Sequence, residues 1–268
     1  MPEKSPSTRY ADLDRDGLQS LAKGLAAIEA FGPDSSSLTL SELARRIGIS
    51  PGSAQRILRT LASLGYVGQD GVHFSLKPRT LQLGFAYLAS LPLTSIAQPL
   101  LSALTQATDE TCSLALLDGA DVVYVARAPA RRLRRDYMAV GTRMPAHATS
   151  VGKVLMAALS PGELEELLTR HPPVGLTFNT LTDPGAVRTA VTHVAEQGYA
   201  INDQETIMGL RSIAVPVIVG SRTIAALGLS VEVVRVSVAD MEERFLSHLH
   251  KTAAAMAAAF AASDAKLQ

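Results

Sequence analysis

The segment from residue 39 to residue 64 constrains the fold most, because it contains two short helical patterns joined by a glycine turn. Thr39 and Glu42 have the three-residue spacing of a capping box at the start of the first pattern. Gly48 begins a three-residue turn, and Ser50 or Pro51 is well placed to start the second helix. Two short helices joined in this way predict a helix-turn-helix, whose second helix enters the major groove of DNA.

The second predicted helix, from Ser50 to Leu64, has an apolar stripe and a polar face. The expected buried stripe is Ala54, Ile57, Leu58 and Leu61. The other positions, together with the end of the preceding helix, supply the candidate DNA-binding residues, which are Arg45, Arg46, Ser50, Ser53, Gln55, Arg56 and Arg59. We expect Ser53, Gln55, Arg56 and Arg59 of the second helix to read bases, and the two arginines of the first helix, together with the hairpin that follows, to hold phosphates.

A hairpin pattern and a local excess of positive charge follow the two helices. Residues 66–67 and 73–76 read as short strands around Gln69-Asp70-Gly71, an Asp-Gly turn that predicts a wing. The whole chain has 25 basic and 25 acidic residues, so any electrostatic argument for nucleic acid has to be local. Residues 39–80 hold six basic residues against two acidic ones, a local net charge of +4, and phosphate neutralisation supplies most non-specific DNA affinity. Charge alone would equally allow arginines that only solvate helix faces, but the glycine turn, the stripe and the hairpin together favour DNA binding.

The single cysteine, Cys112, excludes an intramolecular disulfide framework and is typical of a reducing cytoplasm. Residues 1–17 are polar and charged and lack the apolar core of a secretory signal. No run of about 18 apolar residues is present, so neither a membrane span nor a membrane partner is expected. We therefore expect a cytoplasmic protein.

The sequence contains no convincing enzyme motif. Ser150 and Lys153 match the Ser-x-x-Lys pattern of penicillin-recognising enzymes, but the companion Ser-Asp-Asn and Lys-Thr-Gly motifs are absent. His248 and His250 are two positions apart on a predicted helix and therefore point to different faces, which makes them a poor metal pair. The sequence predicts no catalytic residue, no cofactor and no metal site, and Cys112 reads as a small buried residue rather than a nucleophile.

Motifs along almost the whole chain resemble, in order, those of the IclR family of transcriptional regulators. They are Gly17–Leu25, the helix-turn-helix, Leu64–Val67, Lys77–Arg79, Leu83-Gly84, Tyr87-Leu88, Ser90-Leu91, Val140–Lys153, Gly198-Tyr199, Asp203–Glu205 and Gly209–Ala214. The resemblance covers residues 18–262. Within the family, the opening helix and the segments at Tyr87 and Thr149-Ser150 are most similar to regulators of protocatechuate, 4-hydroxybenzoate and β-ketoadipate breakdown.

The remaining patterns predict an α+β fold on an antiparallel sheet, because strands in hairpins are mixed with separate helices. Helices are expected at 18–31, 76–91, 95–108, 150–159, 162–169, 186–197 and 238–262, and strands at 113–117, 122–126, 199–202, 213–219 and 223–231. The expected organisation is a disordered arm (1–16), a winged helix-turn-helix domain (17–78), a linker helix (79–92) and an effector-binding and oligomerisation domain (93–263), with Pro92 and Pro99 punctuating the junction. The resemblance implies that the last domain is similar to the GAF and profilin folds.

A candidate ligand site begins at the segment Thr149–Gly152, which opens a predicted helix, so that its free N–H groups and hydroxyls favour an anionic group. In the IclR family, small organic acids bind at this segment and at facing strand residues, which the resemblance places at Ser150, Val151, Asn202, Ser212, Gly228 and Ser230. Asn202 stands where an acid is common in the family, Ser212 where cysteine is common, and Gly228 where serine is common.

These departures favour a bulkier, aromatic acid, because the loss of an acid at position 202 makes the pocket less hostile to a carboxylate and Gly228 frees room. The alternative is that Ser150 merely caps its helix and that Ser212 simply lies in a strand. His147 precedes the segment and reads either as a core histidine with a hydrogen-bond partner or as a group behind the pocket.

The expected partners are double-stranded operator DNA, a small organic acid and further copies of the chain. A dimer is expected because palindromic operators need two recognition helices about one helical turn apart, and the resemblance adds tetramers formed through the effector domains. The helices at 18–31 and 76–91 are the expected dimer contacts. Residues 131–135 are four arginines around Leu133 and read as a solvated loop, although they could also attract an anion or contact DNA or a partner. The alternative function is a metabolite sensor whose winged helix contacts protein rather than DNA.

Overall fold

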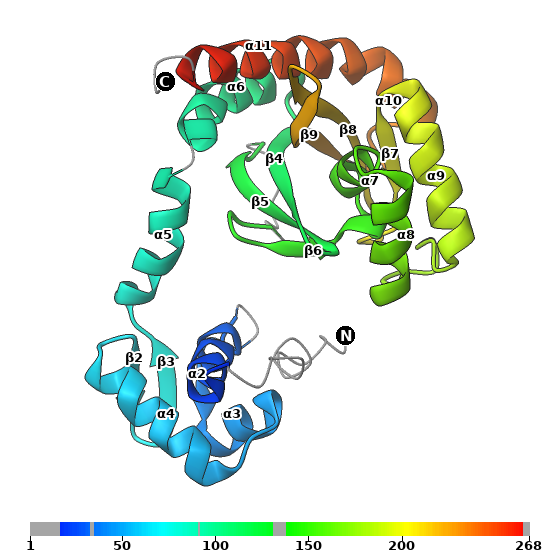
Figure 1. The fold of residues 1–268 in the computed structure, drawn as a ribbon. Helices are drawn as coiled ribbons and strands as arrows, with labels where there is room; N and C mark the ends of the chain where they lie inside the picture. Colours follow the sequence, from blue (N-terminus) through cyan, green and yellow to red (C-terminus); the bar gives the residue numbers. More distant parts are fainter. Residues whose placement is uncertain (1–16, 33–34, 91, 131–137, 265–268) are drawn as a thin grey trace. The chain divides into compact units, whose positions relative to one another are not determined.

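The computed structural model describes residues 17–32, 35–90, 92–130 and 138–264, which form two compact units (Figure 1). The division lies between Tyr87 and Leu88, inside the segment that the sequence predicts as the linker. The predicted arm (1–16) and the arginine cluster (131–135) lie outside the described residues. The domain limits derived from the sequence stay a prediction.

The first unit combines helices with a small sheet, as the winged helix-turn-helix pattern predicts. Its described elements are α2 (Gln19–Glu29), β1 (Leu38–Thr39), α3 (Leu40–Ile47), α4 (Pro51–Ser63), β2 (Val67–Asp70) and β3 (His73–Leu76). The strands are antiparallel and have the order β1-β3-β2. Leu43 of α3, Leu58 of α4 and Val67 of β2 are buried in one core with Ala26 and Ala27 of α2.

Side-chain caps explain where α3 and α4 begin. Thr39 and Glu42 form both hydrogen bonds of the predicted capping box: the Glu42 amide donates to Thr39 Oγ1 at 3.3 Å, and the Thr39 amide donates to Glu42 Oε2 at 2.7 Å. α3 ends at Gly48, whose φ of 70° lies in the left-handed region that favours glycine. Ser50 caps α4, and Pro51 is its first residue. Local chemistry therefore produces the tight turn between the two helices.

The hairpin after α4 differs from its prediction by one residue. Asp70 pairs with His73, so the loop is Gly71-Val72, and Gly71 has a left-handed φ of 57°. The predicted turn at 69–71 is therefore wrong by one position, since Gln69 and Asp70 still belong to β2. The sequence gives no sign of β1, because a two-residue strand has no periodic pattern and is defined only by its pairing with β3.

The predicted helix 76–91 is divided in the structure. Leu76 is the last residue of β3, residues Pro78–Thr80 form a 3₁₀ turn, and α5 spans Leu81–Ser90. No α5 residue is buried in the part of the chain that the structure describes, and Leu81 and Phe85 are 75% and 70% exposed.

The next helix, α6 (Pro92–Thr108), begins three residues before its predicted start and, like the predicted helix, contains Pro99. Leu93, Ala97 and Leu101 of α6 are buried against the sheet of the second unit. We attribute the continuous helix to this packing, which outweighs the roughly 3 kcal/mol that an internal proline costs a helix.

The second unit contains a six-stranded sheet in the order β6-β5-β4-β9-β8-β7, and every neighbouring pair is antiparallel. The strands are β4 (Thr111–Asp118), β5 (Asp121–Ala128), β6 (Arg143–Pro145), β7 (Ala200–Asp203), β8 (Leu210–Val219) and β9 (Arg222–Glu232). The predicted α+β fold on an antiparallel sheet is thus confirmed, although the short edge strand β6 is missing from the prediction.

Helices cover both faces of this sheet (Figure 1). α6 lies on one face with the C-terminal helical segment, which consists of α10 (Val238–Met241), a π-helical turn (Glu242–Leu246) and α11 (Ser247–Asp264). α7 (Ser150–Met156), α8 (Pro161–Arg170) and α9 (Pro184–Gln197) lie on the other face. All residues of α7 are buried, so this helix is enclosed by the sheet and its neighbours.

Side-chain size differs between the two faces of β8 and β9. The residues buried toward α6 and α11 are large and include Ile213, Val215, Leu227 and Leu229. The residues that alternate with them toward α7 are small and include Ala214, Ala226 and Gly228. Small side chains allow α7 to pack close to the sheet, and the candidate pocket lies at this contact.

Among the described helices, no single one has both the length and the apolar composition of a membrane span. One bent pair, Pro78–Ser90 with Leu93–Thr108, meets both criteria when the two helices are taken together.

Candidate functional site

The first candidate site is the outer face of α4. Gln55, Arg56 and Arg59 are exposed on it, whereas Ala54 and Leu58 face the core. The predicted stripe therefore faces the core, although its member Ile57 is half-buried rather than fully buried. The geometry leaves one amide and two guanidinium groups free to meet base edges, which is the chemistry that reads purines in a major groove.

Ser50 and Ser53 are less available than the sequence suggests. Ser50 Oγ accepts a hydrogen bond from the Ser53 amide at 3.3 Å and donates to Ser53 Oγ at 3.0 Å. Both hydroxyls therefore take part in the cap of α4. Ser53 is half-buried, and Ser50 is exposed at the very start of the helix.

The arginines differ in how free they are. Arg45 is exposed and Arg46 half-buried in the last turn of α3. Within the described ranges, Arg45, Arg56 and Arg59 form no ion pair, so their charge is available to an anionic partner. Arg79 is different, because its Nη1 donates to the Leu64 carbonyl at 2.7 Å and its guanidinium lies 5.2 Å from the Tyr66 ring centre. One of the six local basic residues thus holds the hairpin to the end of α4.

The second candidate site is a pocket between α7 and the sheet. It is lined by Ser113, Tyr124, Met138, Thr149, Ser150, Val151, Asn202, Thr206, Leu210, Ser212, Gly228 and Ser230. All six residues that the resemblance proposes are among these twelve. Thr149 belongs to the segment that the sequence analysis singled out, and the analysis missed the other five, which are Ser113, Tyr124, Met138, Thr206 and Leu210. Ser113 pairs with Gly228 across β4 and β9, and no local pattern reveals that pairing.

The pocket is nearly closed in this structure. The free volume inside it is about 10 Å³, close to the room that one water molecule needs. Ser150 Oγ and Ser212 Oγ form a hydrogen bond of 2.8 Å across it. An organic acid can therefore enter only if the lining side chains move apart and this hydrogen bond is replaced.

Gly228 does not free room, contrary to the prediction from sequence. A Cβ atom at position 228 would lie 2.6 Å from Val151 Cγ1, so the Val151 methyl group already fills the space that the missing side chain leaves. Glycine is needed here for the close approach of α7 to β9, and the inference of a larger pocket from Gly228 is wrong for this conformation.

Asn202 is a brace between two backbone segments. Its side chain is buried, its Nδ2 donates to the Ala148 carbonyl, and its Oδ1 accepts from the Glu205 amide at 3.2 Å. These bonds join the segment before α7 to the segment after β7. Asn202 contributes no negative charge to the pocket wall. However, both polar atoms of its side chain are already hydrogen-bonded to the backbone.

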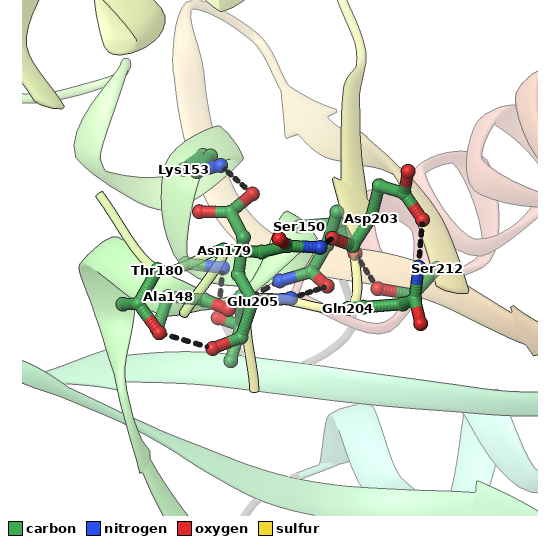
Figure 2. A network of polar contacts seen from close by, with 12 residues as sticks. Ala148, Ser150, Lys153, Asn179, Thr180, Asp203, Gln204, Glu205 and Ser212 are labelled. Carbon is green, nitrogen blue, oxygen red and sulfur yellow. Dashed lines mark hydrogen bonds and ion pairs between the residues drawn. The ribbon is translucent and has the colours of Figure 1, made fainter. Parts of the chain in front are cut away.

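A buried ion pair behind the pocket is the feature that the sequence analysis missed most clearly. Lys153 of α7 and Glu205 are only 4% and 7% exposed, and Lys153 Nζ pairs with Glu205 Oε1 (Figure 2). The Glu205 carbonyl accepts from Thr180 Oγ1 at 2.6 Å, and Thr177 Oγ1 donates to the Gln204 carbonyl at 2.7 Å. The pair therefore connects α7 to a loop that is itself hydrogen-bonded to the segment between α8 and α9.

The partners of Ser150 and Lys153 bear on the Ser-x-x-Lys pattern noted in the sequence. Ser150 is bonded to Ser212, while Lys153 is bonded to Glu205, so the hydroxyl and the amine have different partners. Among the described residues, Ser150 and Lys153 therefore form no hydrogen bond with each other.

The helix dipole contributes less to the pocket than the sequence predicts. α7 ends at Met156 and has seven residues, whereas the prediction ran to Leu159. Thr149 caps it by accepting from the Gly152 amide at 2.9 Å. The Thr149 cap therefore already takes up one of the N–H groups at the start of this short helix.

His147 and Cys112 are core residues. His147 Nε2 lies 3.0 Å from the Val174 carbonyl, and burial lowers the pKa of the imidazole, which supports the reading of a histidine with a hydrogen-bond partner. Cys112 is fully buried, and burial raises the pKa of its thiol to about 11, so it is a poor nucleophile. No group of three or more possible metal ligands occurs among the residues placed by the structure.

Comparisons with known proteins match both parts of the chain. The IclR helix-turn-helix domain model matches residues 20–71, and the model of the bacterial transcriptional regulator IclR C-terminal domain matches residues 85–258. The Pca regulon regulatory protein of Pseudomonas putida is 41% identical over 235 residues, which are 87% of this chain and 81% of that protein.

Two solved structures are similar to the chain. A transcriptional regulator from Rhodococcus sp. RHA1 is 40% identical with a TM-score of 0.80, over 92% of this chain and all of the other. The inducer-binding domain of a PobR double mutant from Acinetobacter, in complex with 3-hydroxybenzoic acid, is 32% identical with a TM-score of 0.59, over 62% of this chain and 98% of that domain.

Proposed function

Since the chain belongs to the IclR family of bacterial transcriptional regulators, we propose that α4 of its first unit reads operator DNA and that the pocket beside α7 binds an aromatic acid that changes the affinity for DNA. The observation that carries the proposal is the exposed, unpaired face of α4, opposite a buried stripe. The proposed domains are 17–78 for DNA binding, 79–92 as the linker and 93–263 for effector binding and oligomerisation.

The proposed division of labour follows side-chain chemistry. Gln55, Arg56 and Arg59 read bases, with Ser53 beside them, because amide and guanidinium groups can make paired hydrogen bonds to purine edges. Arg45, Arg46 and the start of α4 at Ser50 bind phosphates, which position the protein without reading sequence.

Replacing Arg56 with alanine is expected to weaken binding to the operator by about 1–3 kcal/mol, roughly 5- to 150-fold, with a much smaller loss on random DNA. The reason is that a base contact distinguishes sequences, whereas a phosphate contact does not. Gel shifts at one fixed salt concentration, with the upstream region of the protein's own gene and with random DNA of equal length, measure both affinities.

Arg45→Ala is the matched control, since this exposed arginine is proposed to contact phosphate. It is expected to lower the affinity for operator and random DNA by the same factor. It should also reduce the slope of log affinity against log salt concentration by about one. Equal losses on operator and random DNA for Arg56→Ala would refute the base-reading role. No shift of any DNA by the wild-type protein would favour a winged helix that contacts protein.

The proposed effector is an aromatic carboxylic acid. The pocket lining is uncharged and rich in hydroxyl groups, so it can donate hydrogen bonds to a carboxylate without repelling it. The PobR inducer-binding domain, bound to 3-hydroxybenzoic acid, supports this class of ligand. In the proposal, the carboxylate replaces the mutual hydrogen bond of Ser150 and Ser212.

Adding 3- or 4-hydroxybenzoate to the gel shift is expected to change operator affinity by about fivefold or more, because an effector acts only through unequal binding to the two states. Ser212→Ala is expected to raise the acid concentration needed by roughly tenfold, the cost of a hydrogen bond to a charged group. Ser221→Ala, an exposed serine in the turn between β8 and β9, is the control and should change nothing. An unchanged response of Ser212→Ala would contradict the proposed carboxylate site.

We also propose that the chain forms a dimer through α2 and α5, as the sequence predicts. Leu18 and Leu21 are 71% and 60% exposed at the start of α2, and α5 exposes Leu81 and Phe85. Apolar groups exposed in this number are typical of an interface between subunits. Sedimentation of the full chain gives the mass directly, and a monomer at micromolar concentration would contradict the proposal.

A further inference from the structure

The hydroxyl groups of the pocket fall into two classes. Thr149, Ser150 and Ser212 have hydrogen-bond partners within the protein. The side-chain hydroxyls of Tyr124 and Ser113 have none in the described portion of the chain, although both residues are buried. Neither oxygen is among the fully enclosed polar atoms without a partner, so each keeps some accessible surface at which a ligand group can form a hydrogen bond.

Tyr124 is the more informative of the two. It lies on β5, is 6% exposed, and belongs to the same core cluster as α7. Burial raises the pKa of its phenol to about 12, so the hydroxyl keeps its proton at neutral pH and can both donate and accept a hydrogen bond. Buried tyrosines usually have a partner for this group, and here the hydroxyl has none among the described residues while Tyr124 lines the pocket.

Tyr124 and Ser212 line the pocket from two different strands, β5 and β8. β5 and β8 are separated by β4 and β9, so their backbones are about 14 Å apart, three strand spacings. Between them, Gly228 has no side chain, and Ser113 of β4 and Ser230 of β9 add two hydroxyl groups to the lining. A ligand that touches both ends has a polar group at each end.

We propose that Tyr124 determines the specificity of the pocket by forming a hydrogen bond to a hydroxyl group on the ring of an aromatic acid whose carboxylate lies at Ser150 and Ser212. The inference rests on the proposed function, because it names the substituent that the aromatic acid carries. Benzoate lacks the substituent and leaves the phenol without a partner, whereas a hydroxybenzoate satisfies it.

The test is a set of calorimetric titrations of the full chain with benzoate, 3-hydroxybenzoate and 4-hydroxybenzoate, for the wild type and for Tyr124→Phe. The wild type is expected to bind at least one hydroxybenzoate about tenfold more tightly than benzoate. Tyr124→Phe is expected to lose that preference, with the Kd for benzoate changed by less than about twofold, because the ring and its packing are kept. Tyr199→Phe is the matched control, since Tyr199 packs on the opposite face of the sheet and should keep the full preference.

The outcomes separate the two proposals. If none of the three acids binds the wild type, the proposed effector class is wrong and this inference falls with it. If hydroxybenzoates bind and Tyr124→Phe keeps the preference over benzoate, the effector class stands and the role of Tyr124 is overturned. A loss of benzoate binding as large as that of the hydroxybenzoates also overturns it, because the phenol then acts on the shape of the pocket.

Discussion

Replacing Lys153 with methionine is expected to lower the free energy of unfolding of the second unit by about 3–5 kcal/mol. The change leaves the Glu205 carboxylate buried beside α7 with no cation to compensate it. Glu205 Oε2 already has no hydrogen-bond partner among the described residues, so no neighbouring donor is in place to take over. The chain contains no tryptophan, so urea unfolding followed by far-UV circular dichroism is the suitable measurement.

Two variants test whether the cost comes from the unpaired charge. Lys153→Met combined with Glu205→Leu removes both charges and is expected to recover most of the stability, since apolar residues often replace a buried pair without loss. Arg188→Met breaks an ion pair of 2.6 Å with Glu165 whose side chains are 47% and 57% exposed, and it should cost less than about 1 kcal/mol. A cost for Lys153→Met no larger than that of Arg188→Met would show that the buried pair does not hold α7 in place.

Replacing Gly152 with alanine is expected to destabilise the second unit by at least about 3 kcal/mol. The added Cβ would lie 2.1 Å from the Ala146 carbonyl oxygen and 2.5 Å from Thr149 Oγ1. The first of these atoms belongs to the backbone and cannot rotate away, and the second caps α7. The helix therefore has to shift as a body, which also separates Ser150 from Ser212 and is expected to abolish effector binding.

Gly162→Ala is the matched control in the same unit. Gly162 lies in α8 and has nothing within 4 Å of an added Cβ, so alanine should stabilise the helix by up to about 1 kcal/mol. Thermal and urea unfolding of the two variants should move in opposite directions. If the Gly152→Ala protein is as stable as the wild type and still binds the effector, the prediction is wrong, and α7 can accept the added methyl group by a small backbone shift.

The first unit could be predicted well because its signals are local. The capping box of Thr39 and Glu42 and the left-handed Gly48 each involve residues within a few positions of one another. The exposed face of α4 follows from the spacing of its apolar residues. The prediction failed for β1 and was wrong by one residue for the hairpin turn, because these elements are defined by hydrogen bonds between strands and not by a periodic pattern of apolar residues.

The pocket could be predicted only in part. The family resemblance supplied Ser150, Val151, Asn202, Ser212, Gly228 and Ser230, and all of them line it. It did not supply Tyr124 or Ser113, whose places depend on strand register in β4 and β5. It also misjudged Gly228, because the distance between α7 and β9 is set by the packing of Val151.

Local patterns were thus sufficient to predict the helix-turn-helix and the antiparallel α+β character of the second unit, and the family resemblance added part of the pocket lining. Three features became visible only in the folded chain: Lys153 pairs with Glu205, Asn202 is hydrogen-bonded to the backbone, and the Tyr124 hydroxyl has no partner among the described residues. The physical reason is the range of the interactions. Caps and turns are formed by neighbours in the chain, whereas Lys153 and Glu205 are 52 positions apart and meet only after the sheet has assembled.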